Sequence, residues 1–238
     1  ENRPHIAVGV SGGPDSTALV YLLSKWIKFK NGKITALIFN HGIRSESKEE
    51  SFQVKNMIGD FNLEVKIITP NKKRLIKKNM ANARENRFEG MINYCIKKNI
   101  FHLFLGHHFD DNLETYLIRK INGSNLEGLG SMNEITYFKN IQIVRPFINM
   151  SKSSILNYNK NNKLTFINDP TNKDINFTRI KVRKFLLNKN YQLQVKNDFL
   201  SLKKQIPNYK TMVWELLILC LINVSSNKIT LNLNKLMK

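Results

Sequence analysis

The amino-acid sequence predicts an α/β fold: a parallel sheet with helices on both of its faces, followed by a partial helical C-terminal region. Short runs rich in β-branched residues alternate with longer segments in which apolar residues recur three and four positions apart. This alternation favours a parallel sheet covered by helices. With 238 residues, of which 42% are hydrophobic, the chain is also long enough to bury a core.

The first 145 residues contain the elements of this sheet. The predicted strands span residues 5–10, 34–39, 63–69, 101–106 and 141–145. The predicted helices between them span residues 17–29, 48–61, 74–98 and 111–122. Polar segments 11–16, 40–44 and 107–111 follow the first, second and fourth strands. Ligands of such sheets bind at the carboxyl ends of the strands, so these segments are the candidate site.

The character of the sequence changes after residue 151. We expect a short helix over 153–161, an extended piece over 164–167, a turn-rich loop over 168–176 and a basic helix over 179–187. A boundary is predicted near 188–195, with helical segments at 197–204 and 211–223 beyond it. The apolar run 212–224 is too short to span a bilayer and contains Glu215, which predicts a buried helix.

The charge of the chain indicates a polyanionic partner. Lys and Arg number 38 against 18 Asp and Glu, a formal net charge of +20. RNA, DNA and an anionic membrane surface are all compatible with this excess, and a compositional drift toward Lys and Asn is the plainer explanation of part of it. Residues 101–150 carry 4 basic and 5 acidic side chains, whereas residues 151–238 carry 16 and 4. This distribution favours an acidic pocket beside a basic docking surface.

The cysteine content argues against several classes of protein. Cys95 and Cys220 stand far apart, which disfavours a disulfide scaffold and a Cys-rich metal or iron–sulfur site. This usage suits a reducing compartment, so we expect a cytoplasmic protein. No signal peptide is visible, and we expect no membrane partner. The chain opens on Glu1 rather than Met and ends in a lysine-rich segment, which is compatible with trimmed ends.

The loop SGGPDS at residues 11–16 predicts a phosphate site. It lacks the lysine of a G-x-x-x-x-G-K-[ST] loop and the spacing of a G-x-G-x-x-G loop. Its two glycines let backbone N–H groups approach an anion, and its proline suits the first turn of a helix, whose N-terminus favours negative charge. Its aspartate would repel phosphate unless a Mg²⁺ ion bridges the two. The alternative is a plain capped strand-to-helix turn. The nucleotide-binding candidates are Ser11, Gly12, Gly13, Pro14, Asp15 and Ser16.

A second cluster of polar residues lies in GHHFDDNLET, residues 106–115. His107, Asp111 and Glu114 are spaced three and four apart, which places them on one face of a helix. With His108 and Asp110 these residues form a cluster at the carboxyl end of a strand. Such a cluster suits Mg²⁺ or a cationic substrate, and it could equally supply a base for an amine nucleophile. The alternative is an acidic helix start favoured by the helix dipole.

These segments resemble a known enzyme family. Residues 11–16 are similar to the pyrophosphate loop of the N-type ATP pyrophosphatases, which adenylate a substrate and release pyrophosphate. Within that superfamily the chain resembles the tRNA(Ile)-lysidine synthases over roughly residues 5–190. The resemblance is carried in order by NHGIRSES (40–47), ANARENRF (81–88), GHHFDDNLET (106–115), RPF (145–147) and NDPTN…FTRIKVR (168–183).

The resemblance implies a Rossmann-like fold of the adenine nucleotide alpha hydrolase type and a specific reaction. The C2 oxygen of the wobble cytidine of tRNA(Ile) with a CAU anticodon would attack the α-phosphate of ATP. Free L-lysine would then displace AMP to give lysidine, with Mg²⁺ assisting. Residues 1–190 would be the catalytic domain, and residues 191–238 a helical linker or the start of a tRNA-binding domain. The oligomeric state is left open, with a homodimer as one option.

The resemblance also implies roles for individual residues. Asp111 and Glu114 would bind and activate the lysine substrate, and Asp15, with Asp110 or Asp111, would hold the metal and the phosphates. The catalytic candidates are Asp15, His107, Asp111 and Glu114. The nucleotide candidate beyond the loop is His41, and the candidates for phosphate or lysine contacts are Arg84, Arg87, Asp110 and Arg179. The tRNA candidates are Arg44, Lys181, Arg183 and Lys184.

Some positions depart from the family pattern, and other functions compete. Asn122, Asn125, Ile180 and Lys181 differ from the residues typical of the family, which puts fine substrate contacts in doubt. Only part of a further tRNA-gripping domain would fit after residue 195, so the sequence is either cut or that of a compact member. The enzymatic rivals are a pyrophosphate-loop tRNA thiolase and a small-molecule ligase of the superfamily. The remaining rival is a non-catalytic module that binds nucleotide and RNA.

Overall fold

The computed structural model of the chain describes residues 3–40, 47–61, 63–69, 80–167, 178–225, 228–232 and 235. The chain divides into two compact units. The first comprises Glu1–Asn112 and Met132–Asp174, and the second comprises Leu113–Ser131 and Ile175–Lys238. Helix α4 (Phe109–Ile121) gives its first residues to the first unit and the remainder to the second.

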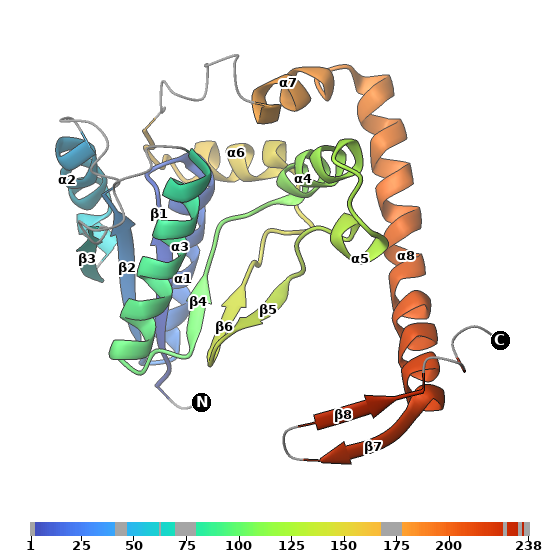
Figure 1. Cartoon of the computed structure of the whole chain (residues 1–238). Coiled ribbons are helices and arrows are strands. Elements are labelled where there is room, and N and C mark those ends of the chain that lie inside the picture. Colours follow the sequence, from blue (N-terminus) through green and yellow to red (C-terminus); the bar gives the residue numbers. More distant parts are fainter. Residues whose placement is uncertain are drawn as a thin grey trace. The chain divides into compact units, whose positions relative to one another are not determined.

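The first unit is built on a mostly parallel six-stranded sheet (Figure 1). Its strands are β1 (His5–Val10), β2 (Lys33–Phe39), β3 (Glu64–Ile68), β4 (His102–Phe104), β5 (Ile135–Phe138) and β6 (Ile141–Val144). Their order in the sheet is β3-β2-β1-β4-β6-β5. All neighbours pair in parallel except β5, which runs antiparallel to β6 at the edge.

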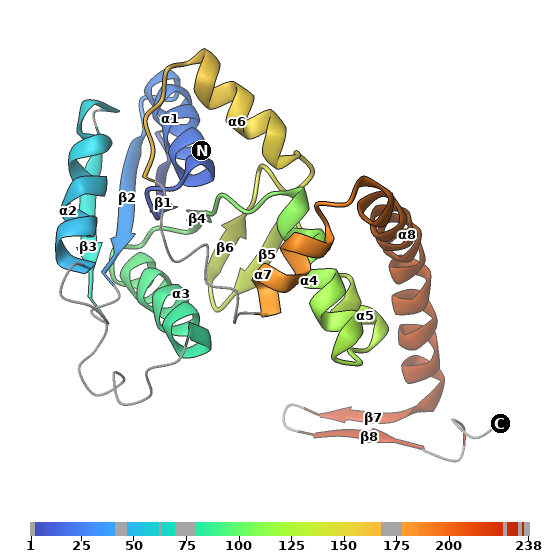
Figure 2. The same cartoon turned by 90° about the horizontal axis from the view of Figure 1, so that it is seen from above.

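Helices cover both faces of this sheet, as Figure 2 shows from above. Side chains of successive strand residues point to opposite faces. Ile6 and Val8 pack with the helices α1 (Pro14–Phe29), α2 (Ser47–Met57) and α6 (Lys152–Asn161). Ala7 and Leu37 pack on the other face with the helix α3 (Met80–Lys97). A one-turn helix, η1 (Gly59–Phe61), lies between α2 and β3.

The second unit contains the rest of α4 and the C-terminal elements. These are the helices α5 (Leu126–Leu129), α7 (Thr178–Phe185) and α8 (Lys189–Cys220), and the strands β7 (Leu221–Ser225) and β8 (Lys228–Leu231). Phe199 of α8 is fully buried against Tyr116 of α4, with the ring centroids 5.3 Å apart. The side chain of Asn188 caps the start of α8 by accepting hydrogen bonds from the N–H groups of Asn190 and Tyr191.

The predicted α/β fold is confirmed, and most elements lie where the sequence places them. The five predicted strands and the helices between them are present, as are the helices near 153–161 and 179–187. The strand β5 was not predicted, and its antiparallel pairing makes the sheet mixed rather than purely parallel. Residues 164–167 form no strand, although the N–H of Ile167 donates to the carbonyl oxygen of Gly12 at 2.9 Å. The predicted loop over 168–176 lies outside the described residues.

The C-terminal prediction is wrong in three respects. Helix α8 runs without a break from Lys189 to Cys220, through Pro207, where two separate helical segments were expected. The helix ends at Cys220, and the residues that follow, 221–225, form strand β7, which pairs with β8. The apolar run 212–224 is also not a buried helix, since Trp214 is 65% exposed and Ile218 is 67% exposed. None of the helices among the described residues has the length and hydropathy needed to cross a bilayer.

Candidate active site

The sheet of the first unit creates a ligand position at the carboxyl ends of β1 and β4. Strand β1 is followed in the chain by β2 on one side, while β4 lies on its other side. Ligands of open α/β sheets bind where the strand order reverses in this way. A Cβ atom on Gly106, just after β4, would lie 3.1 Å from the carbonyl carbon of Asp15. The absence of a side chain at this glycine therefore lets the end of β4 approach the loop after β1.

The loop at residues 11–16 is closed by its own hydrogen bonds. The hydroxyl of Ser16 donates to the carbonyl oxygen of Gly13 at 3.0 Å, and the N–H of Ser11 donates to the same hydroxyl at 3.2 Å. Gly12 has a φ of +83°, and a Cβ there would lie 2.6 Å from Val54. A larger residue would meet both backbone strain and this side chain. The sequence thus fixes a tight turn at the N-terminus of α1, the arrangement expected for an anion cradle.

Four titratable side chains gather beside this loop in the first unit. The ring of His108, which is buried, lies between three carboxylates. Its Nε2 is 3.8 Å from Asp15 Oδ1 and 3.5 Å from Asp111 Oδ2. Its Nδ1 is 3.6 Å from Asp110 Oδ2. The structure therefore brings Asp15, Asp110 and Asp111 together, as the sequence predicted, around a histidine to which the sequence gave no separate role.

The charges in this cluster alter the proton affinity of its members. Burial alone would lower the pKa of His108, but its hydrogen bond to Asp110 and the charges of Asp111 and Asp15 raise it overall. Burial would raise the pKa of Asp110, yet the hydrogen bonds from His108 and from the backbone N–H of Lys152 lower it overall. The cluster consequently makes the protonated form of His108 more favourable than burial alone would allow.

Lys152 is a member of this site that the sequence reasoning missed. It is the first residue of α6, and its ammonium group contacts both carboxylate oxygens of Asp15, at 2.7 Å from Oδ1. Its backbone N–H donates to Asp110 Oδ2 at 2.7 Å. The segment RPF at 145–147 pointed to this part of the chain. A single lysine among 38 basic residues, however, offered no further signal.

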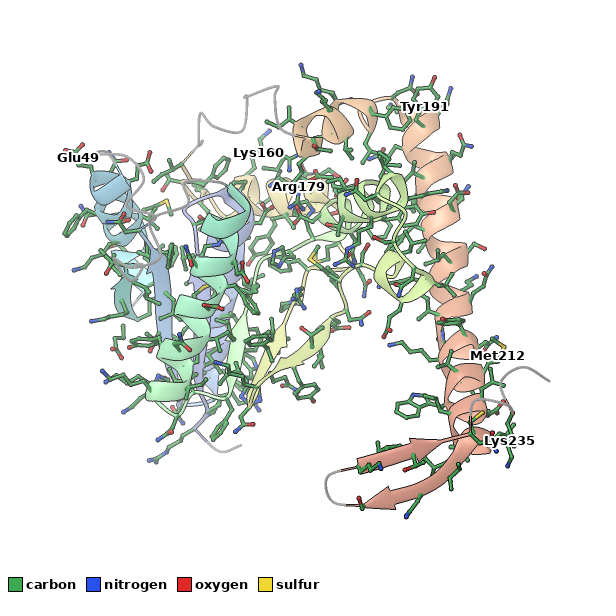
Figure 3. All side chains as sticks on the ribbon, in the orientation of Figure 1. Glu49, Lys160, Arg179, Tyr191, Met212 and Lys235 are labelled. Atoms are coloured by element: carbon green, nitrogen blue, oxygen red, sulfur yellow. The ribbon has the colours of Figure 1, made fainter. Side chains whose placement is uncertain are left out.

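A separate arrangement in the second unit surrounds Glu114. This carboxylate is buried, and it accepts hydrogen bonds at 2.7 Å from the Nε atoms of both Arg179 and Arg183. A second nitrogen of Arg183 lies 3.1 Å from Glu114 Oε2. Figure 3 shows Arg179 on α7, the helix that carries both arginines. Glu114 is therefore engaged with two guanidinium groups, a state less suited to binding a substrate amine than that of a free carboxylate.

The remaining predicted residues are placed as follows. His107 is half-buried between β4 and α4, and Arg87 is half-buried on α3. Lys181 and Lys184 are exposed on α7. His41 and Arg44 lie outside the described residues, as does the side chain of Arg84.

The carboxylates beside the loop at residues 11–16 would suit a metal ion that a bound ligand also coordinates. Across the described residues, no group of three or more His, Cys, Asp or Glu side chains is arranged to hold a metal ion. Mg²⁺ that travels with a nucleotide needs only one or two carboxylates, because phosphate oxygens and water complete its coordination. Asp15 is one such carboxylate, and Asp110 or Asp111 would be the second.

The two cysteines are poorly suited to chemistry. Cys95 lies on α3 and is buried in the core, where burial raises the pKa of its thiol to about 12. Cys220 is buried at the end of α8. A reactive cysteine needs a lowered pKa and access to a substrate, so neither residue matches a catalytic thiol.

Comparison with known proteins agrees with the geometry. A family model described as the PP-loop domain matches residues 1–190. The tRNA(Ile)-lysidine synthase of Orientia tsutsugamushi is 36% identical over 208 residues, which are 87% of this chain and 46% of that protein. The tRNA(Ile)-lysidine synthase of Wolbachia pipientis wMel is 36% identical over 183 residues, or 76% and 42%. The chain spans about half the length of the curated relatives it matches.

A solved structure shares the fold. The U34-tRNA thiolase of Methanococcus maripaludis, solved with its [4Fe–4S] cluster, aligns with a TM-score of 0.71. The alignment covers 88% of this chain and 72% of that chain at 20% sequence identity. At this identity the likeness concerns the fold alone.

Proposed function

Because this chain belongs to the PP-loop domain family, we propose that it is the catalytic part of a tRNA(Ile)-lysidine synthase. The reaction would ligate free L-lysine to C2 of the wobble cytidine in tRNA(Ile) with a CAU anticodon. ATP would first adenylate the cytidine and release pyrophosphate, and lysine would then displace AMP. The observation that carries this proposal is the loop 11–16, which meets the carboxylate cluster at the ends of β1 and β4.

The loop at residues 11–16 would bind the phosphates of ATP in the activation step. Its closed turn at the start of α1 offers backbone N–H groups and a helix N-terminus to the phosphates. Mg²⁺, held by Asp15 and Asp110, would neutralise the charge that develops on the departing pyrophosphate. Gly106 lets the end of β4 approach this loop. Asp110 and Asp111, which follow β4 in the chain, would then stand beside the bound phosphates.

The carboxylate Asp111 is our candidate for binding and deprotonating the substrate amine. An ammonium group must lose a proton before it can attack, and a carboxylate within reach can both bind and accept that proton. We assign Glu114 a different role from that of Asp111, because Arg179 and Arg183 already donate hydrogen bonds to both of its carboxylate oxygens. We propose that it holds the two arginines for the carboxylate of lysine or for phosphate.

The alternative functions fit less well. A thiolase with a [4Fe–4S] cluster requires several cysteine ligands, and this chain has two cysteines, both buried. A non-catalytic module would have no need of the carboxylates around His108. The curated relatives are named tRNA(Ile)-lysidine synthases. A reaction on tRNA that consumes ATP and free lysine belongs in the cytoplasm, where we place the protein.

The decisive experiment supplies the purified protein with ATP, Mg²⁺, labelled lysine and tRNA(Ile) carrying CAU. We expect label at the wobble base and none on a tRNA with a different anticodon. A protein with the Asp111→Asn change is expected to bind ATP as before and to lose lysine transfer by a factor of about 10² or more. Absence of labelled tRNA with both this chain and a version extended to the length of its relatives would overturn the proposal.

A further inference from the structure

The ammonium group of Lys152 lies against the loop that we propose as the phosphate site. The loop at residues 11–16 contains no lysine or arginine, although many phosphate loops place a lysine there. Lys152 comes from α6, far along the chain, and its ammonium group lies on Asp15 of that loop. About a third of its side chain remains exposed, since its relative exposure is 34%. An incoming anion can therefore reach it.

Two contacts fix this lysine at the site from different directions. Its ammonium group pairs with Asp15, and its backbone N–H pairs with Asp110. The start of α6 is itself stabilised by Ser151, whose hydroxyl accepts from the N–H of Ser154 at 3.2 Å. The backbone at Lys152 is thus anchored, whereas its long side chain can change partner without moving the helix.

In this arrangement the Asp15 carboxylate is the anion that pairs with Lys152. We propose that Lys152 is the pyrophosphate-binding cation of the site, and that its ammonium group transfers from Asp15 to a β- or γ-phosphate oxygen when ATP binds. A phosphate chain carries more negative charge than one carboxylate, so the ammonium group gains by the exchange. Asp15 is then released to bind the metal ion that accompanies the nucleotide. This inference rests on the proposed use of ATP.

The test compares ligands that differ in the phosphates that Lys152 would contact. Binding of inorganic pyrophosphate, ATP and AMP, each with Mg²⁺, is measured by calorimetry on the wild-type chain and on Lys152→Gln. We expect the change to weaken pyrophosphate and ATP binding about tenfold or more and AMP binding less than twofold. Lys152→Arg should retain most of the affinity. Lys160→Gln, which alters an exposed lysine of the same helix (Figure 3), should change nothing.

A second measurement needs no variant. Amine-reactive labelling of the wild-type chain, read by mass spectrometry, should show that pyrophosphate slows modification of Lys152 and leaves Lys160 unaffected. Equal labelling of Lys152 with and without pyrophosphate, or equal weakening of AMP and pyrophosphate by Lys152→Gln, would overturn the inference. If the variant binds pyrophosphate normally while the wild-type chain makes lysidine, this inference fails and the proposed function stands. If pyrophosphate binding depends on Lys152 but no lysidine forms with the extended protein, the proposed function fails and this inference stands.

Discussion

His108 shows how a single residue can couple the carboxylates of the site. Its imidazole lies within 3.8 Å of Asp15, Asp110 and Asp111, so one proton is shared among groups that would otherwise repel one another. Lys152 adds a positive charge that opposes protonation of this ring, and the carboxylates outweigh it. The protonation of His108 is therefore part of what holds the cluster together.

This coupling makes the stability of the fold depend on pH. The pKa of His108 is raised above its ordinary value of 6.5, so its contribution is fully present below that value and is lost as pH rises through the folded-state pKa. We expect His108→Asn to lower the free energy of unfolding by about 1–3 kcal/mol near pH 5.5. The difference from wild type should shrink toward pH 9. Urea unfolding in metal-free buffer across this range measures it, and a difference that is constant with pH would contradict the assignment.

At the residue scale the sequence pointed to some of the residues that the structure brings together. Asp15, Asp110 and Asp111 were identified because each lies in a polar segment that follows a strand. His108 was seen in the same segment, but burial between carboxylates is a tertiary property that spacing does not reveal. Lys152 was missed because its partner, Asp15, is remote in sequence and joined to it by the fold alone.

Among the elements, α7 depends on a buried carboxylate for its position. The helix has eight residues, which is too short to be stable in isolation, and its two arginines meet Glu114 of α4. The Glu114 side chain is 4% exposed, whereas those of Arg179 and Arg183 are 30% and 45% exposed. The buried Glu114 therefore anchors helix α7 through its contacts with the two arginines.

Removal of this charge should loosen α7 specifically. We expect Glu114→Gln to speed amide hydrogen exchange within residues 178–185 about tenfold or more, because the helix loses its charged hydrogen bonds. The matched control is Glu127→Gln, which removes an exposed carboxylate that pairs with Lys210 at 2.9 Å. This control should leave exchange in α7 unchanged. If both variants behave alike, Glu114 does not hold the helix.

The local sequence does not indicate the elements that the prediction missed. Strand β5 has largely exposed side chains at Ile135 and Tyr137, so it lacks the apolar pattern of a core strand. It exists because its backbone pairs with β6 and because the buried Arg145 donates to Thr136 at 2.9 Å. Helix α8 was predicted as two segments, and Pro207, a residue type that usually ends a helix, lies between them. Local signals identified strands β1, β2 and β6 and helix α1, since these have a buried face.

For the whole molecule, the net charge of +20 predicts that binding of tRNA depends strongly on salt. Phosphate contacts release counterions, so each one adds to the slope of affinity against salt concentration. Lys181 and Lys184 are exposed on α7 and are our candidates for such contacts. We expect the double change to alanine to lower that slope by about 1–2 and to weaken binding at low salt.

Filter binding of tRNA(Ile) at several salt concentrations measures this effect. The control is the double change of Lys139 and Lys160 to alanine, which removes two exposed lysines of the first unit. The control should weaken binding less and leave the slope closer to that of the wild type. An equal loss of tRNA affinity in the two double variants would show that the net charge of the whole chain governs binding and that α7 has no docking role.

The close approach at Gly106 has a consequence for evolution and for protein engineering. A Cβ on Gly106 would press on the backbone of Asp15 and Ser16, so the loop after β1 and the end of β4 form one shape divided between two distant stretches of sequence. Recombination that replaces one stretch with that of a relative and leaves the other unchanged would separate two matched surfaces. The two stretches have to be inherited, or transplanted, as a pair.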